Sequence, residues 1–160
     1  MVRRAFFSFH YDNDVTRANV VRNSWVTRGK EAAGFIDKAE FEKLKIQGQK
    51  AIYDWIDNQL TGTSVTVVLI GAETLNRKYV QYEILESYKR GKAIIGVQIG
   101  NIKNLSGLIS SSQSQYTKIG KDDAGKDIWF SDVIEGFYNY SSDDGYSNLG
   151  TWIENAANKK

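Results

Sequence analysis

Glu83 stands at a point in the sequence where a carboxylate could act on a bound ligand. The segment from Asn76 to Glu86 lies between two apolar runs, Val65–Ile70 and Ala93–Ile99, which are typical of buried strands. The segment itself is typical of a helix, so Glu83 falls early in a helix that follows the carboxyl end of a strand. Open α/β sheets bind their ligands at that edge. A carboxylate fixed there could hydrogen-bond a ribose hydroxyl and stabilise an oxocarbenium-like transition state.

The spacing around Glu83 also supports a simpler interpretation. Glu83 shares one face of the predicted helix with Tyr79, four residues before it. The opposite face, which is expected to pack inward, carries the apolar residues Val80, Ile84 and Tyr88. Spacing alone therefore favours an ordinary solvated carboxylate at position 83.

Ser8 and His10 form a second polar pair, at the end of the first apolar run. Side chains alternate along a strand, so Phe6, Ser8 and His10 should point to one side while Phe7 and Phe9 point to the other. Ser8 and His10 could then hydrogen-bond a ligand at the mouth of the sheet. The alternative is that His10 makes a local hydrogen bond that holds the following loop.

The elements that must position these residues alternate between strands and helices. Four strands are expected, at Ala5–Phe9, Ala33–Ile36, Val65–Ile70 and Ala93–Ile99. Three helices, with apolar positions every three or four residues, separate these strands. The first helix is expected to be capped by Asn13 or Asp14, the second to end near Gly62 and the third to end at Gly91. This alternation predicts an α/β fold in which a parallel sheet is covered by helices on both faces.

The pattern weakens after Gly100. Residues 101–127 are expected to form irregular connections, with a hairpin around Lys121–Lys126. A last helix carries the apolar stripe Leu149, Trp152, Ile153 and Ala156, with Asp143 or Asp144 near its positive end. Since no linker, repeat or low-complexity tract interrupts the chain, we expect residues 1–160 to form a single domain.

The composition argues against several functional classes. The chain has no cysteine and one histidine, which excludes thiolate metal sites and argues against any transition-metal site. The net charge is +2 and the basic residues are scattered, so a nucleic-acid-binding face is not expected. No apolar run approaches the roughly 18 residues of a membrane span or the length of a secretory signal. We therefore expect a cytoplasmic protein that binds neither nucleic acid nor membrane.

Several segments resemble, in order and spacing, the TIR-like domain family. They are Arg4–Tyr11, Gly34–Asp37, Thr63–Gly71, Arg77–Ile84, Gly91–Ile99 and Ser142–Ala157. Within the family, the sequence is most similar to the TIR-like subunits of Thoeris anti-phage systems, particularly in Phe6–Tyr11, Asn19–Thr27 and Thr63–Gly71. The resemblance implies a flavodoxin-like fold, which agrees with the order of elements predicted above.

The resemblance also implies an active site. Enzymatic TIR domains cleave the nicotinamide–ribose bond of NAD with a glutamate on the helix after the third strand, and Glu83 matches that glutamate by position. Tyr79 stands where many TIR domains carry a tryptophan, which keeps the pocket wall aromatic. Substrate binding is expected of residues on the first strand, at the end of the second and at the start of this helix: Phe6, Ser8, His10, Asp37, Asn76 and Tyr79.

Thoeris TIR-like proteins are understood to sense infection and to convert NAD into a cyclic ADP-ribose isomer that activates a separate effector. The resemblance thus implies an enzyme of the NAD nucleosidase or ADP-ribosyl cyclase type, with NAD as substrate and with no cofactor or metal. Its implied partners are a phage-derived trigger and an effector reached through a diffusible nucleotide, and a homo-oligomer is compatible with the family.

Two other classes remain open. The domain could be a non-catalytic interaction module, as many TIR domains are, or a flavodoxin-like binder of a small ligand. The Ser/Thr-rich phosphate loop that follows the first strand of a flavodoxin is missing here, which argues against FMN.

Overall fold

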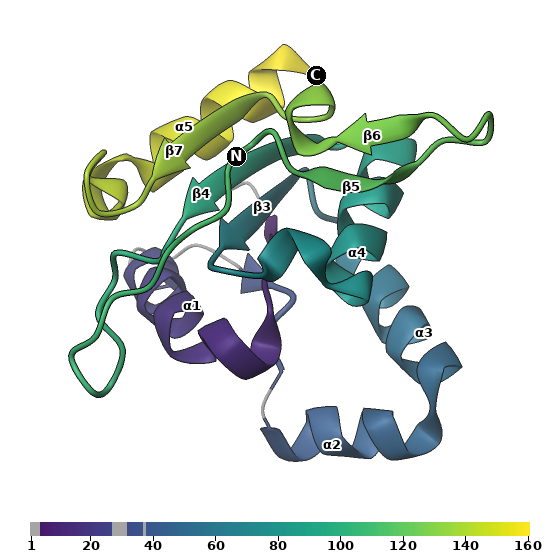
Figure 1. Ribbon diagram of the computed structural model, residues 1–160, viewed down its shortest axis with the longest axis horizontal. Coiled ribbons are helices and arrows are strands. Elements are labelled where there is room, and N and C mark those ends of the chain that lie inside the picture. The colour runs from purple at the N-terminus through teal and green to yellow at the C-terminus, as the bar shows by residue number, and fades with distance from the viewer. Residues whose placement is uncertain (1–3, 27–31, 37) are drawn as a thin grey trace.

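A five-stranded parallel sheet forms the centre of the computed structural model, which describes residues 4–26, 32–36 and 38–160 (Figure 1). The strands are β1 (Ala5–Ser8), β2 (Ala32–Ala33), β3 (Val65–Ile70), β4 (Ala93–Gln98) and β7 (Gly136–Asn139). Their order is β2-β1-β3-β4-β7, and every neighbouring pair is parallel. This is the flavodoxin-like order of a doubly wound sheet, and it confirms the predicted fold class.

Helices cover both faces of this sheet. One face packs against α1 (Tyr11–Val26) and α5 (Gly145–Lys159), and the other against α3 (Gln49–Leu60) and α4 (Lys78–Lys89). A further helix, α2 (Lys38–Gln47), lies away from the sheet and connects to it through α3 (Figure 1). Two short 3-10 helices, Thr74–Asn76 and Phe130–Asp132, complete the helical elements of the described ranges. None of these helices combines the length and the apolar character needed to cross a membrane.

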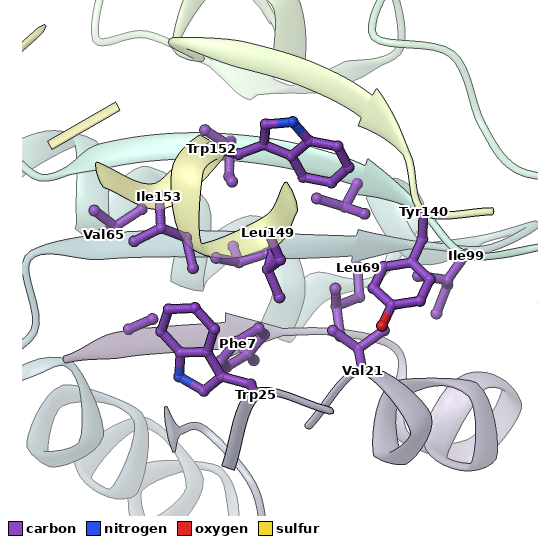
Figure 2. Packing of buried hydrophobic residues seen from close by; sticks show 14 of the residues in the cluster. Phe7, Val21, Trp25, Val65, Leu69, Ile99, Tyr140, Leu149, Trp152 and Ile153 are labelled. Carbon is purple, nitrogen blue, oxygen red and sulfur yellow. The ribbon is translucent and has the colours of Figure 1, made fainter. Parts of the chain in front are cut away.

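The larger part of the core lies between the sheet and the α1/α5 layer. Figure 2 shows Trp25 of α1 and Leu149 and Trp152 of α5 gathered with Phe7 over the central strands. The Phe7 and Trp25 rings meet edge to face with 6.2 Å between their centroids. Such burial of aromatic surface is the main force that fixes β1 between the two layers.

Successive side chains of β1 point to opposite faces of the sheet, as predicted. Phe7 and Phe9 belong to the core under α1 and α5, whereas Phe6 packs against Ile52 and Ile56 of α3. Ser8 points to the same side as Phe6 and reaches α4. The first strand therefore delivers its one polar side chain to the face that carries Glu83.

The buried stripe of α4 differs from the prediction. It consists of Val80, Glu83, Ile84 and Ser87, while Tyr88 is 49% exposed. The predicted inward position of Tyr88 and the solvated position of Glu83 were therefore wrong. Both polar members of the stripe have hydrogen-bond partners inside the protein, which offset the cost of their burial.

Other differences from the prediction lie at the ends of elements. Helix α1 begins at Tyr11, so neither Asn13 nor Asp14 caps it; Asp14 is buried and its carboxylate accepts a hydrogen bond from the Thr74 hydroxyl at 3.2 Å. The second strand ends at Ala33, because Gly34 adopts φ 91° and turns the chain out of the sheet.

Besides the two 3-10 helices, one α-helix and one strand were not predicted. Helix α2 has no fully buried residue, and its apolar face consists of only Phe41 and Leu44, which is too short a stripe to reveal it. Strand β7 is a short edge strand whose four residues are all half-buried, so its sequence lacks the strong apolar run of a central strand.

The predicted hairpin and final helix are confirmed. The hairpin pairs β5 (Lys118–Lys121) with β6 (Asp127–Trp129), and its turn is held by Asp122, whose carboxylate accepts the amides of Ala124 and Lys126. Asp144 caps α5 and accepts a hydrogen bond from the amide of Ser147.

Candidate functional site

A cavity of about 410 Å³ opens at the carboxyl ends of β1 and β2, beside the first turns of α4. Its wall is built from the segments that follow β1 and β2, from α2 and α3, and from the start of α4. The cavity lies next to the switch point between β1 and β3, where a sheet of this order binds its ligands. It is therefore the candidate site of this fold.

Glu83 lies in the wall of this cavity and is only 6% exposed. The Ser8 hydroxyl donates a hydrogen bond of 2.8 Å to Glu83 Oε1, and the Ser87 hydroxyl donates one of 2.7 Å to the Glu83 backbone carbonyl. Burial raises the pKa of Glu83 to about 8, while the hydrogen bond from Ser8 acts in the opposite direction. A pKa of about 8 favours the protonated form of this carboxyl group at neutral pH, and a bound cation would favour the ionised form.

His10 lies in the same wall and is 7% exposed. Both of its ring nitrogens are buried, and neither has a hydrogen-bond partner within the described part of the chain. The local hydrogen bond considered above is thus absent among those residues. Burial lowers the pKa of His10, as does the charge of Arg77, against smaller opposing effects from nearby carboxylates. The site therefore holds a neutral imidazole with unused hydrogen-bonding capacity.

Aromatic rings line much of the remaining wall. The rings of Tyr11 and Phe41 lie 4.6 Å apart at an interplanar angle of 31°, so α2 closes against the start of α1. On the other side, Tyr79 meets Tyr53 edge to face at 5.6 Å. Such surfaces suit a flat heterocycle, which can stack on them.

The residues predicted to form the site divide into two groups. Glu83, His10, Asn76 and Tyr79 all line the cavity. Phe6 is fully buried in the core under α3, outside the cavity wall, and Ser8 is also fully buried and acts on the cavity through Glu83. Asp37 lies outside the described residues.

Sequence reasoning missed other residues of the wall. Phe41 and Lys45 belong to α2, a helix that was itself missed. Arg77 and Lys78 stand inside the segment that was singled out, but a pair of basic residues by itself does not signal binding. In the described part of the chain, no three His, Cys, Asp or Glu side chains lie together in a group that could hold a metal ion.

Comparison with known proteins gives a family match over most of the sheet. Residues 6–104 match the family model described as Thoeris protein ThsB, TIR-like domain. A curated protein of Bacillus cereus (strain MSX-D12), named "Putative cyclic ADP-D-ribose synthase ThsB1", is 36% identical; the alignment covers 96% of this chain and 100% of that protein.

Among solved structures, the chain is similar to the CMP N-glycosidase BcmB of Clostridium botulinum. The two share 15% identity with a TM-score of 0.46, over 94% of this chain and 99% of the other.

Proposed function

The chain belongs to the Thoeris ThsB family of TIR-like domains, and from this premise we propose that it is an enzyme that converts NAD into a cyclic isomer of ADP-ribose. The similar protein of Bacillus cereus carries the name of a cyclic ADP-D-ribose synthase, which supports the choice of substrate and product. NAD is the substrate in this proposal, and no cofactor or metal takes part.

The observation that carries the proposal is the buried carboxyl group of Glu83 in the cavity wall, oriented by Ser8. A carboxyl group that is buried without an ionic partner has a raised pKa and lowers the stability of the fold when it ionises. Carboxyl groups with such perturbed pKa values are typical of catalytic sites. Within the described residues, Glu83 alone among the carboxyl groups combines a place in the cavity wall with burial, since Asp12 in the same wall is exposed.

The proposed reaction begins with cleavage of the bond between nicotinamide and ribose. The nicotinamide ring of NAD is cationic, and its approach would lower the pKa of Glu83 and favour the carboxylate. The carboxylate would hydrogen-bond the ribose while positive charge develops at the anomeric carbon. The bonding electron pair leaves with the nicotinamide nitrogen, so nicotinamide departs as a neutral molecule.

A second nucleophile completes the reaction. A hydroxyl group or an adenine nitrogen of the same molecule forms the new bond to the anomeric carbon, and one proton is released. Cyclisation prevails over hydrolysis only where water is kept from the anomeric carbon. The aromatic side chains of Tyr11, Phe41 and Tyr79 in the cavity wall are suited to fold the substrate and displace water.

The remaining parts of the proposal concern signalling. The protein would act in the cytoplasm, where a phage-derived trigger would activate it. The cyclic product would then diffuse to a separate effector. These steps rest on membership of the Thoeris family.

A non-catalytic interaction module is the second candidate, and one observation favours it. The loop after β4 presents Leu105, Leu108 and Ile109 to solvent with exposed fractions between 62% and 92%. Exposed aliphatic side chains gathered in one loop are typical of a contact surface for another protein. Such a module would bind NAD, if at all, without consuming it.

The two candidates are separated by product analysis. NAD is incubated with the purified protein, alone and with lysate from phage-infected cells, and the products are identified by chromatography with mass detection. Nicotinamide together with a product of the mass of cyclic ADP-ribose is the expected result. Free ADP-ribose would instead make the protein a hydrolase, and unchanged NAD under both conditions would favour the interaction module.

A further inference from the structure

The first turn of α4 presents unused hydrogen-bond donors to the cavity. Arg77 precedes the helix with an extended backbone, and no side chain caps the helix start. The amides of Lys78, Tyr79 and Val80 make no hydrogen bond to another described residue, and all three residues line the cavity. The start of a helix carries a partial positive charge and free N–H groups, which together suit an anion.

Cationic side chains surround this helix start. Arg77, Lys78 and Lys45 all line the cavity, and in the described ranges neither Arg77 nor Lys78 forms an ion pair with a carboxylate. The Lys78 ammonium group lies 5.9 Å from the ring centroids of Tyr53 and Tyr79, and Tyr79 belongs to the cavity wall. Lys45 is partly neutralised by Glu42, with 3.5 Å between the charged atoms.

Among the described residues, fewer negative than positive charges belong to the cavity wall. Asp12 is an exposed carboxylate of the wall, and the charges of Asp14 and Glu73, outside the wall, also act on His10. Glu83 adds little negative charge at neutral pH, because burial raises its pKa to about 8. The described residues of the wall therefore carry a net positive charge, which attracts anions.

His10 provides an independent sign that the cavity receives a polar ligand. Its imidazole is buried in the cavity wall with both nitrogens unpartnered among the described residues. A buried donor without a partner is unfavourable, and a ligand oxygen at this position would supply the missing hydrogen bond.

We propose that the first turn of α4, together with Arg77, Lys78 and His10, forms a binding site for the diphosphate group of a nucleotide. The site rests on the proposed function only for the choice of NAD as that nucleotide. Tyr79 and Glu83 are four residues apart, so the helix start and the carboxyl group are separated by about 6 Å along the helix axis. One ribose ring separates the phosphate from the anomeric carbon in NAD. A single helix would therefore hold the diphosphate and place the ribose against Glu83.

Binding measurements test this site without any turnover. The affinities of inorganic pyrophosphate, ADP-ribose and adenosine are measured by calorimetry at low ionic strength for the wild type, Arg77→Gln and Lys78→Gln. Each substitution should weaken ADP-ribose and pyrophosphate roughly tenfold, because each removes one charge-assisted contact. Adenosine has no phosphate, so its affinity should not change.

Lys89→Gln is the matched control. Lys89 is exposed at the opposite end of the same helix, so its replacement removes the same charge outside the cavity. All three affinities should stay at the wild-type values in this variant. An equal loss of affinity in Lys89→Gln would mean that net charge, and not a built site, attracts the ligand.

A proline variant tests the backbone contribution. Arg77 has φ −83° and ψ 132°, a conformation that readily precedes proline, and proline is well tolerated at the first position of a helix. Lys78→Pro should therefore keep the fold while it removes the amide as well as the charge. We expect it to bind pyrophosphate several-fold more weakly than Lys78→Gln, and equal affinities would exclude the amide from the site.

The outcomes separate this site from the proposed reaction. The proposed diphosphate site is refuted if the wild type binds neither pyrophosphate nor ADP-ribose. It is also refuted if Arg77→Gln and Lys78→Gln bind both ligands as the wild type does. Sensitive binding with no turnover of NAD would leave the site standing and refute the proposed reaction. If the protein turns over NAD but Arg77→Gln and Lys78→Gln bind both ligands as the wild type does, the proposed reaction stands and the proposed site is refuted.

Discussion

The hydroxyl of Ser8 donates a hydrogen bond of 2.8 Å to Oε1 of Glu83, and both side chains are buried. This bond joins the end of β1 to the middle of α4, two elements that are 75 residues apart in the sequence. It fixes one oxygen of the carboxyl group, while the cavity wall leaves the group accessible to a ligand. The proposed chemistry depends on this arrangement.

Ser8→Ala should impair catalysis more than folding. The substitution removes the one hydrogen bond that, among the described residues, favours the ionised carboxylate, so the pKa of Glu83 should rise further. We expect the rate of NAD turnover to fall about tenfold at neutral pH. The increase of the rate with pH, which follows the ionisation of Glu83, should move to higher pH. Rates measured between pH 6 and about 9 check this expectation.

Ser87→Ala is the control for that measurement. Ser87 is equally buried on α4, but its hydroxyl bonds the backbone carbonyl of Glu83 and lies 2.7 Å from the Thr66 hydroxyl. Ser87→Ala should lower the free energy of unfolding by about 1 kcal/mol without a shift in the pH profile of NAD turnover. The same shift in both serine variants would contradict the role assigned to Ser8.

Glu83→Gln should stabilise the protein, and more so as the pH rises. Burial raises the pKa of Glu83 from the usual 4.5 to about 8 in the folded protein. Between pH 4.5 and about 8, Glu83 is therefore mostly protonated in the folded protein and mostly ionised in the unfolded chain. The wild type therefore loses up to about 1.4 kcal/mol of stability per pH unit across that window because of Glu83. Below the window and above it, the contribution of Glu83 no longer changes with pH.

Denaturant unfolding of both proteins at a series of pH values tests this prediction. Glutamine can still accept the hydrogen bond from Ser8, so the variant isolates the ionisation. The difference between variant and wild type should be near zero at pH 4.5 and largest above about pH 8. A difference that is independent of pH would mean that Glu83 titrates normally.

Arg17→Lys should loosen the loop after β4. Arg17 is buried, and its guanidinium group donates hydrogen bonds to the carbonyls of Ile102 at 2.6 Å and Leu108 at 3.0 Å. A lysine ammonium group cannot span two carbonyls as the planar guanidinium does. We expect a loss of about 2 kcal/mol in unfolding free energy and faster proteolysis between residues 101 and 110.

Arg22→Lys serves as the comparison for this variant. Arg22 lies on the same helix, but its guanidinium group packs over the ring of Phe35, with 5.5 Å between the guanidinium carbon and the ring centroid. Its replacement should leave the cleavage of residues 101–110 at the wild-type rate.

Gly34→Ala should distort the wall of the cavity. A Cβ atom at position 34 would lie 2.3 Å from the carbonyl oxygen of Phe7, and the backbone φ of 91° is unfavourable for alanine. Gly125→Ala has a similar φ of 82° but open space around the added atom, so it should cost only about 1 kcal/mol. We expect Gly34→Ala to cost at least about 2 kcal/mol more, because the backbone of β1 cannot move freely. Thermal unfolding of the pair checks this difference.

The fold could be predicted from the sequence because its central strands are almost purely apolar. Val65–Ile70 and Ala93–Gln98 are buried on both faces of the sheet, and such runs have few other interpretations. Helix α2 and strand β7 escaped prediction for the opposite reason, since neither buries a continuous set of apolar residues. The faces to which the side chains of β1 point were predicted correctly, because successive side chains of a strand must point to opposite faces of the sheet.

The candidate site could be predicted only in part. Periodicity assigns a polar residue to the solvent side of a helix, so the burial of Glu83 could not be foreseen from spacing. Its importance came from its place after a strand and from the resemblance to the TIR-like family. The contribution of Phe41 to the wall depends on how α2 packs beside α1, which no local pattern encodes.

The most direct test of the account is the initial rate of nicotinamide release from NAD by the wild type, Glu83→Gln and Glu86→Gln, with and without lysate from phage-infected cells. Glu86 is the matched control, since it lies on the same helix and pairs with Arg90 away from the cavity. We predict that Glu83→Gln loses at least about a hundredfold in rate while Glu86→Gln stays within about twofold of the wild type. Release of nicotinamide by Glu83→Gln at the wild-type rate would contradict the account.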